Sequence, residues 1–223
     1  MTFLMAGVRF LYLMIAPSSR YPWSTHMLLL APLLMVMVFI LLCVGWWGEP
    51  VRHFFATLST WYPNLTEVMH ILTHMGNPLV YSVYLIILLR AIVQKRHREL
   101  FFALRCLLFS VLFLCVVMQM LKYGLGMPRP GIPWPPQPLA LVDSYASFPS
   151  GHTATIIAAA VPLALWFRRR SFSWAAALLI ALMGISRMWL GQHHPIDILG
   201  GIVLGSLAAR FIASPDKDTR RER

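Results

Sequence analysis

The sequence predicts an all-α, polytopic membrane protein with six transmembrane helices and a short N-terminal interfacial helix. Of its 223 residues, 58% are hydrophobic and only 12% are charged, whereas about a quarter of the residues of a soluble domain are charged. The apolar residues form long runs rather than the stripes of amphipathic soluble helices. No linker divides the chain, so residues 1–223 are predicted to form a single membrane domain.

The N-terminal segment, residues 1–22, is interpreted as the interfacial part of this domain. Its apolar stretch is interrupted by Arg9, and no Lys or Arg precedes that stretch. A secretory signal peptide carries a basic region before its apolar core, so a helix lying at the membrane surface is the better interpretation.

Six apolar runs follow, each long enough to cross the membrane or nearly so. The first ends in Trp46 and Trp47, which would anchor it among the lipid headgroups. The fourth is stopped by the three arginines 168–170. The predicted spans are His26–Trp47, Pro78–Gln94, Phe101–Leu121, Gly151–Phe167, Ser171–Leu190 and Pro195–Ile212.

The connecting segments differ in character. Residues 48–76 mix aromatic, polar and turn residues and are predicted to be a loop with one or two short surface helices. Residues 123–149 form a long loop, whose proline-rich part, residues 131–138, is either a semi-rigid interfacial lid or a plain surface loop. Residues 213–223 are predicted to be a disordered cytoplasmic tail.

Positive charge is distributed unevenly between the two sides of this topology. Fifteen of the 19 Lys and Arg residues fall on one side, and four, Arg52, Lys122, Arg129 and Arg187, fall on the other. By the positive-inside rule both termini are cytoplasmic, and the long loops face the periplasm or cell exterior. The net charge of +11 is therefore explained by topology, and no nucleic-acid partner is predicted.

Three of the four outward cations, Lys122, Arg129 and Arg187, lie beside the ends of predicted spans. Ionisable groups at membrane depth are costly and therefore indicate function. Cations that meet on one face would bind a multivalent anion such as a phosphate. Taken singly, Lys122 is better interpreted as a snorkelling residue and Arg129 as a loop charge, but Arg187 lies within an apolar run.

The segment Pro149-Ser150-Gly151-His152 opens the fourth predicted span. Ser150 suits the N-cap position, and the free N–H groups at a helix start bind anions. Gly151 would let a ligand approach the backbone closely. A plain capped helix start is the alternative, although His152 puts a titratable group where the anion would lie.

His193 and Asp197 flank the start of the sixth predicted span. Pro195 suits a first helical turn, so His193 precedes the helix and Asp197 lies one turn into it. The carboxylate can then bond one ring nitrogen of His193 and leave the other as a nucleophile. A purely structural His–Asp pair is the alternative. The neighbouring His194 is interpreted as an interfacial residue.

Together these segments resemble the three motifs of the type 2 phosphatidic acid phosphatase superfamily, which includes membrane lipid phosphate phosphatases and soluble vanadium haloperoxidases. All eleven motif residues are present in order and at matching spacings between Lys122 and Asp197. The six-span layout extends the resemblance over nearly the whole chain, although residues 1–76 carry no diagnostic motif.

The resemblance implies a role for each motif residue. His193, rather than His194, would attack phosphorus and form a phosphohistidine, while Asp197 orients its ring. His152 would protonate the leaving oxygen and then help to activate water. The implied phosphate-binding groups are Lys122, Arg129, Ser150, Gly151 and Arg187.

The sequence thus predicts a lipid phosphate or diphosphate phosphatase of a bacterial inner membrane, with its site facing outward. No metal or other cofactor is expected, because the loop 123–149 carries one acidic residue, Asp143, and Asp197 is assigned to His193. A lipid phosphotransferase of the same family is an alternative, and a lipid transporter is an alternative from another class. Four substrates are left open, namely phosphatidic acid, phosphatidylglycerophosphate, undecaprenyl diphosphate and a lipid A phosphate, and a bacterial protein would favour the envelope lipids among them.

Overall fold

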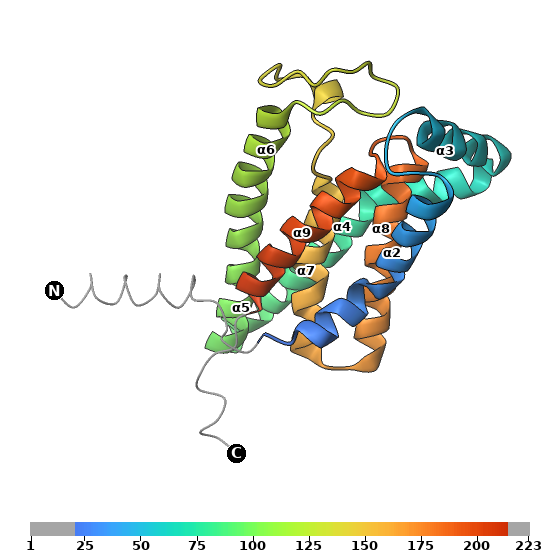
Figure 1. Ribbon diagram of the computed structural model, residues 1–223. Helices are drawn as coiled ribbons and strands as arrows, with labels where there is room; N and C mark the ends of the chain where they lie inside the picture. The colour runs from blue at the N-terminus through green and yellow to red at the C-terminus, as the bar shows by residue number, and fades with distance from the viewer. Residues whose placement is uncertain (1–20, 214–223) are drawn as a thin grey trace.

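The computed structural model describes residues 21–213. The segments 1–20 and 214–223 lie outside the described residues, so nearly all of the predicted interfacial segment and cytoplasmic tail falls there as well. The described part of the chain contains helices, turns and loops but no strand. Figure 1 shows the helices side by side in an elongated bundle. The predicted all-α class is therefore confirmed for residues 21–213.

Eight α-helices make up this bundle within residues 21–213. A π-helical segment, η1 (Ser110–Val117), joins two of them into one continuous helix, and η2 (Asp143–Tyr145) is a single 3-10 turn. The α-helices are α2 (Trp23–Cys43), α3 (Glu49–Trp61), α4 (Pro63–Val93), α5 (His97–Phe109), α6 (Met118–Leu125), α7 (Gly151–Phe167), α8 (Arg170–Trp189) and α9 (Pro195–Ile212).

Four of these helices, α2, α4, α8 and α9, are long and apolar enough to cross a membrane. Two shorter apolar helices, Cys115–Leu125 and Gly151–Phe167, accompany them. The chain is thus a helical protein with several candidate membrane spans. The fourth and sixth predicted runs coincide with α7 and α9, and the first, third and fifth differ from helical segments by a few residues at their ends.

The second predicted span is wrong at its start. Residues 63–76 were expected to belong to a loop with one or two short surface helices. They instead form the first turns of α4, which runs for 31 residues and continues through Pro78. A proline inside a helix removes one hydrogen bond. Buried Met69, Thr73 and Gly76 on this part of α4 outweigh that loss, because α4 packs against α8. The surface helix expected nearby is present as α3.

The central helix of the bundle is α7, which packs against α4, α8 and α9. Its contact with α9 is close because α9 carries Gly201 and Gly205, four residues apart. A Cβ at Gly201 would lie 2.7 Å from the Ser150 carbonyl oxygen, and one at Gly205 would lie 2.6 Å from that of Ala154. Small residues at this spacing let two membrane helices approach each other. The start of α9 is thereby held against the start of α7.

One end of the bundle carries the irregular chain that bears most of the predicted site. Figure 1 shows the loop between α6 and α7, the turn between α8 and α9, and helix α3 at this end. The first and last described residues lie toward the opposite end. We call the end with the α6–α7 loop the loop end of the bundle.

Candidate active site

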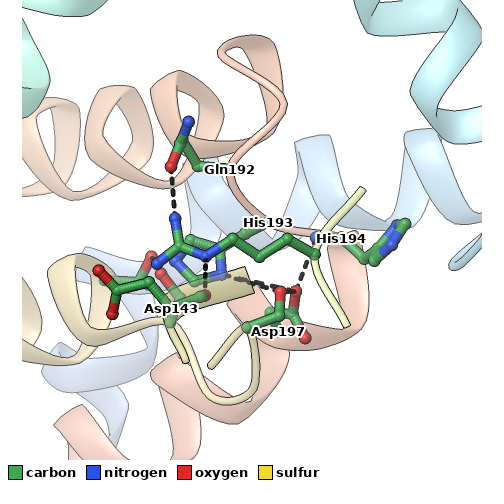
Figure 2. A network of polar contacts seen from close by, with 9 residues as sticks. Asp143, Gln192, His193, His194 and Asp197 are labelled. Carbon is green, nitrogen blue, oxygen red and sulfur yellow. Dashed lines mark hydrogen bonds and ion pairs between the residues drawn. The ribbon is translucent and has the colours of Figure 1, made fainter. Parts of the chain in front are cut away.

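At the loop end, His193 and Asp197 lie close together in the protein interior. His193 belongs to the turn between α8 and α9, and Asp197 belongs to the first turn of α9. The distance between His193 Nδ1 and Asp197 Oδ2 is 3.5 Å, and the two residues are 2% and 0% exposed. Figure 2 shows the ring and the carboxylate facing each other. A buried carboxylate needs such partners.

The Asp197 carboxylate has two nearer donors. The Ser147 hydroxyl donates to Oδ2 at 2.6 Å, and the His194 backbone N–H donates to the same oxygen at 2.7 Å. The other oxygen, Oδ1, is buried without a hydrogen-bond partner in the described part of the chain. The Ser150 N–H also donates to the Asp197 carbonyl at 2.9 Å, which ties the start of α9 to that of α7.

Burial controls the protonation of His193. Desolvation lowers the pKa of His193 from 6.5 to about 4, although the hydrogen bond and the charge of Asp197 act to raise it. The charges of Arg187 and Lys122 lower this pKa further. The ring is therefore neutral at physiological pH, and a neutral imidazole can act as a nucleophile through its unprotonated nitrogen.

Arg187 on α8 is a buried cation, only 7% exposed. Its Nη1 donates to the Thr73 hydroxyl at 3.4 Å, and that hydroxyl lies 2.9 Å from the Ser186 hydroxyl. Its Nε, by contrast, is buried with no hydrogen-bond partner among residues 21–213. An unpaired buried N–H of a charged group is costly. An anionic ligand would satisfy it.

Lys122 on α6 reaches the start of α7. Its Cε and Nζ atoms lie 3.8 Å from the position that a Cβ would take on Gly151. The ammonium group and the backbone at Gly151 therefore border the same space. His152, the next residue, lies within electrostatic range of Lys122, Arg187 and His193.

Ser150 precedes α7 at the N-cap position, as the sequence predicted, but its side chain does not cap the helix. The hydroxyl lies 3.0 Å from the Thr153 hydroxyl, and Ser150 is fully buried. This pairing places the Ser150 hydroxyl at the start of α7, beside Gly151.

Arg129 is held by the loop rather than by a helix. Its backbone N–H donates to the Ser144 carbonyl at 2.9 Å, and its Nε donates to the Asp143 carbonyl at 2.8 Å. Its Nη1 donates to the side-chain oxygen of Gln192 at 2.5 Å. These partners bring Arg129 to the residue that precedes His193. Arg129 also lies within electrostatic range of Lys122 and Arg187.

His194 was interpreted as an interfacial residue, but it is 3% exposed and packs inside the protein. Its ring lies 3.9 Å from the Trp47 ring, centroid to centroid, and Trp47 also meets Trp134 edge to face at 5.9 Å. Figure 2 shows His194 and His193 pointing in opposite directions. Trp47, expected as a lipid anchor, therefore connects the proline-rich loop to the α8–α9 turn.

Thr73, Ser147 and Gln192 are among the residues that contact motif residues but were not expected in the site. Ser147 lies two residues before Pro149, and Gln192 directly precedes His193, so proximity in sequence was their only signal. Thr73 had no signal, because its contacts lie 113 and 114 residues away. Within residues 21–213 no three His, Cys, Asp or Glu side chains are grouped as metal ligands would be.

Taken together, the fold and this site define a helical membrane protein that gathers arginine, lysine and histidine side chains at one end of the bundle. The chain belongs to the PAP2 superfamily, whose family model matches residues 103–219, just over half of the sequence. This family assignment agrees with the resemblance found in the motifs.

Several curated proteins resemble the chain over part of its length. Undecaprenyl-diphosphatase BcrC of Bacillus subtilis is 38% identical over 88 residues, which are 38% of this chain and 45% of that protein. A lipid A 1-phosphatase of Rhizobium johnstonii is 30% identical over 106 residues, 45% of this chain and 42% of that protein. Phosphatidylglycerophosphatase B of Bacillus subtilis is 32% identical over 91 residues, which are 36% of this chain and 44% of that protein. The chain thus spans less than half of each relative, and no solved structure matches it.

Proposed function

We propose that the protein is a membrane lipid phosphatase that removes a terminal phosphate through a phosphohistidine on His193, without a metal ion. The observation that carries this proposal is Arg187, a buried guanidinium whose Nε has no partner in the described chain. It lies at the same end of the bundle as Lys122, His152 and the His193–Asp197 pair. A phosphoryl group would satisfy the free donors and face the imidazole at once.

Each residue has a defined part in the proposed reaction. His193 Nε2 attacks phosphorus, and the bond between phosphorus and the leaving oxygen breaks as His152 donates a proton to that oxygen. Asp197 accepts a hydrogen bond from His193 Nδ1–H and stabilises the positive ring. Water then attacks the phosphohistidine while His152 takes its proton, and inorganic phosphate leaves.

The equatorial phosphate oxygens would be held by donors from four segments. Arg187 comes from α8, Lys122 from α6, Arg129 from the loop, and Ser150 with the Gly151 N–H from the start of α7. Donors fixed in a site that excludes water stabilise the charge of the transition state without reorganisation. Arg129 would engage the phosphate while Asp143 and Gln192 hold the other edges of its guanidinium.

We further propose six membrane spans: α2, α4, the continuous helix α5–η1–α6, α7, α8 and α9. At about 1.5 Å per residue, the helix His97–Leu125 is long enough to cross a hydrocarbon core of about 30 Å. The charge asymmetry supports cytoplasmic termini and a loop end that faces the periplasm or cell exterior. A bacterial inner membrane fits this arrangement, and the bilayer would hold the lipid tail while the headgroup enters the site.

Among the substrates, a polyprenyl diphosphate such as undecaprenyl diphosphate is our first candidate, because the chain is 38% identical to BcrC over 88 residues. A lipid A phosphate and phosphatidylglycerophosphate follow, given the similarity to the two other relatives. A lipid phosphotransferase would use the same first step. A transporter is less well supported, because the ionisable groups cluster at one end rather than along the bundle.

Lipid phosphates should be far better substrates than soluble esters. The apolar tail would contribute binding energy that positions the reacting phosphate, so we expect kcat/KM for a lipid diphosphate to exceed that for p-nitrophenyl phosphate by about 100-fold or more. Phosphate release by purified protein from a panel of the four lipids measures this difference. Equal turnover of lipid and soluble esters would contradict the lipid assignment, and transfer of label to an added acceptor lipid would identify a phosphotransferase.

The intermediate can be trapped directly. Rapid acid-free quenching during turnover of a labelled lipid phosphate should leave a phosphoprotein that is stable in base and labile in acid, as a phosphohistidine is. A transporter would carry no such label.

The pH dependence of kcat/KM should report the lowered pKa of His193. Activity needs the unprotonated ring, so it is present above this pKa and is lost as the pH falls through about 4. Asp197 raises the pKa of His193, so Asp197→Asn should lower the plateau and also move the acid limb to lower pH. The substrate phosphate also titrates, so its pKa is measured separately by phosphorus NMR and the pH profile of kcat/KM is corrected for it. If the acid limb lay at pH 6.5 and did not move in Asp197→Asn, its assignment to His193 would be refuted.

A further inference from the structure

Ser147, which has no role among the motif residues, contacts both members of the His193–Asp197 pair. Ser147 belongs to the end of the α6–α7 loop and is fully buried. Its hydroxyl donates to Asp197 Oδ2 at 2.6 Å and lies 3.5 Å from His193 Nδ1. Its own backbone N–H donates to the Met127 carbonyl at 3.0 Å, which anchors this part of the loop. Ser147 is thus fixed from both its side chain and its backbone.

The distances rank the partners of the carboxylate. An N–H···O hydrogen bond is typically about 2.7–3.2 Å long, so the 3.5 Å between His193 Nδ1 and Asp197 Oδ2 is a loose contact. The Ser147 and His194 donors, at 2.6 and 2.7 Å, have the short lengths of charge-assisted bonds. In this structure the carboxylate is therefore oriented by these two donors, and the imidazole is a third partner of the same oxygen.

Only one of the two strong donors is a side chain. The His194 donor is a backbone N–H, which the helix start supplies whatever the side chain. Asp197 Oδ1 has no partner in the described chain. Without the Ser147 hydroxyl, one backbone N–H would be left to oppose rotation of the carboxylate away from His193.

We propose that Ser147 is a positioning residue: it holds Asp197 Oδ2 toward His193 Nδ1 and keeps the carboxylate ready for the imidazolium that forms during phosphoryl transfer. This inference rests on the proposed phosphohistidine mechanism. Ser147 acts through Asp197 and does not touch the phosphoryl group. As the ring becomes positive, the Nδ1–H···Oδ2 contact shortens, and the Ser147 bond fixes the oxygen that receives it.

Ser147→Ala should therefore lower kcat by about 10- to 100-fold, the usual scale for an outer partner that orients a reacting group. KM and the affinity for vanadate, which probes the phosphate donors, should stay within about twofold. Ser147→Thr keeps the hydroxyl and should recover much of kcat. Ser144→Ala, in the same loop, is the matched control, because only the backbone carbonyl of Ser144 is used.

The pH profile separates positioning from a merely structural role. The charged and titratable groups around His193 are Asp197 on α9, Arg187 on α8, Lys122 on α6 and His152 on α7. Loss of the Ser147 bond frees the Asp197 carboxylate to turn away from His193 and weakens its stabilisation of the imidazolium. Because Asp197 raises the pKa of His193, the acid limb of kcat/KM should move to lower pH in Ser147→Ala, in the same direction as in Asp197→Asn.

A double-mutant cycle completes the test. If Ser147 acts through Asp197, adding Ser147→Ala to Asp197→Asn should cost less than twofold in the single-turnover rate of phosphoprotein formation. Full additivity, an unchanged acid limb, or a loss of vanadate affinity in Ser147→Ala would overturn the inference. The proposed function fails separately: it is overturned if wild-type protein forms no phosphohistidine. If wild-type protein forms the phosphohistidine but Ser147→Ala leaves kcat unchanged, only the positioning role is overturned.

Discussion

Replacement of His193 by Ala should abolish turnover and phosphoprotein formation. The imidazole is the proposed nucleophile, and loss of a nucleophile from a coupled catalytic group costs about 10⁴-fold or more in kcat. Phosphate release and labelling with a radioactive lipid substrate measure the two effects. Vanadate should still bind, because Arg187, Lys122 and the start of α7 remain in place.

The adjacent histidine provides the matched control for this variant. His194→Ala should keep most of the activity, because the ring of His194 packs on Trp47 while its backbone N–H, which donates to Asp197, is retained. Loss of a buried ring should lower thermal stability in detergent. If His194→Ala abolished the phosphoprotein and His193→Ala preserved it, the identity of the nucleophile would be wrong.

Arg187→Ala should reduce kcat/KM by about 10²- to 10³-fold, the effect of removing one donor to a developing anion. Arg187→Lys should recover little of this loss. Lys keeps the charge but lacks both the planar fork and the Nε–H, which is the donor left unpaired in the structure. Kinetics with the best lipid of the panel, together with vanadate inhibition, measure both variants.

Arg210 near the end of α9 is the matched control for Arg187. Its Nε is also buried and unpaired among residues 21–213, and its guanidinium lies 5.8 Å from the Trp23 ring centroid, toward the opposite end of the bundle. Arg210→Ala should leave vanadate affinity unchanged. If the two variants lost stability alike and neither affected vanadate binding, a phosphate-binding role for Arg187 would be untenable.

The helices were predictable wherever the sequence carries strong stop signals. The arginines 168–170 end α7, and Pro195 opens α9, so both helices were predicted with their observed bounds. The same reasoning failed at Pro78, where a proline was taken as a helix start. The packing of Met69 and Thr73 against the rest of the bundle is a tertiary effect, and it overrides the local preference that the sequence displays.

The site was predictable to the extent that chemistry is encoded in spacing. The His193–Asp197 separation implies a contact across one helical turn, and the pair lies 3.5 Å apart. Contacts between distant segments leave no such signature. Thr73 meets Arg187 across 114 residues, and Ser147 meets Asp197 across 50. These partners became visible once the packing of α4 on α8 and of α7 on α9 was known.

The close packing of α7 against α9 ties the interior of the bundle to the geometry of the proposed site. His152 lies in the first turn of α7, and His193 lies in the turn just before α9; the two helices pack closely at Gly201 and Gly205. A larger side chain at Gly205 would push α7 and α9 apart. The distance between His152, the proposed proton donor, and His193, the proposed nucleophile, would then increase. The relative position of the two imidazoles that we propose to react thus depends on two glycines in the interior of the bundle.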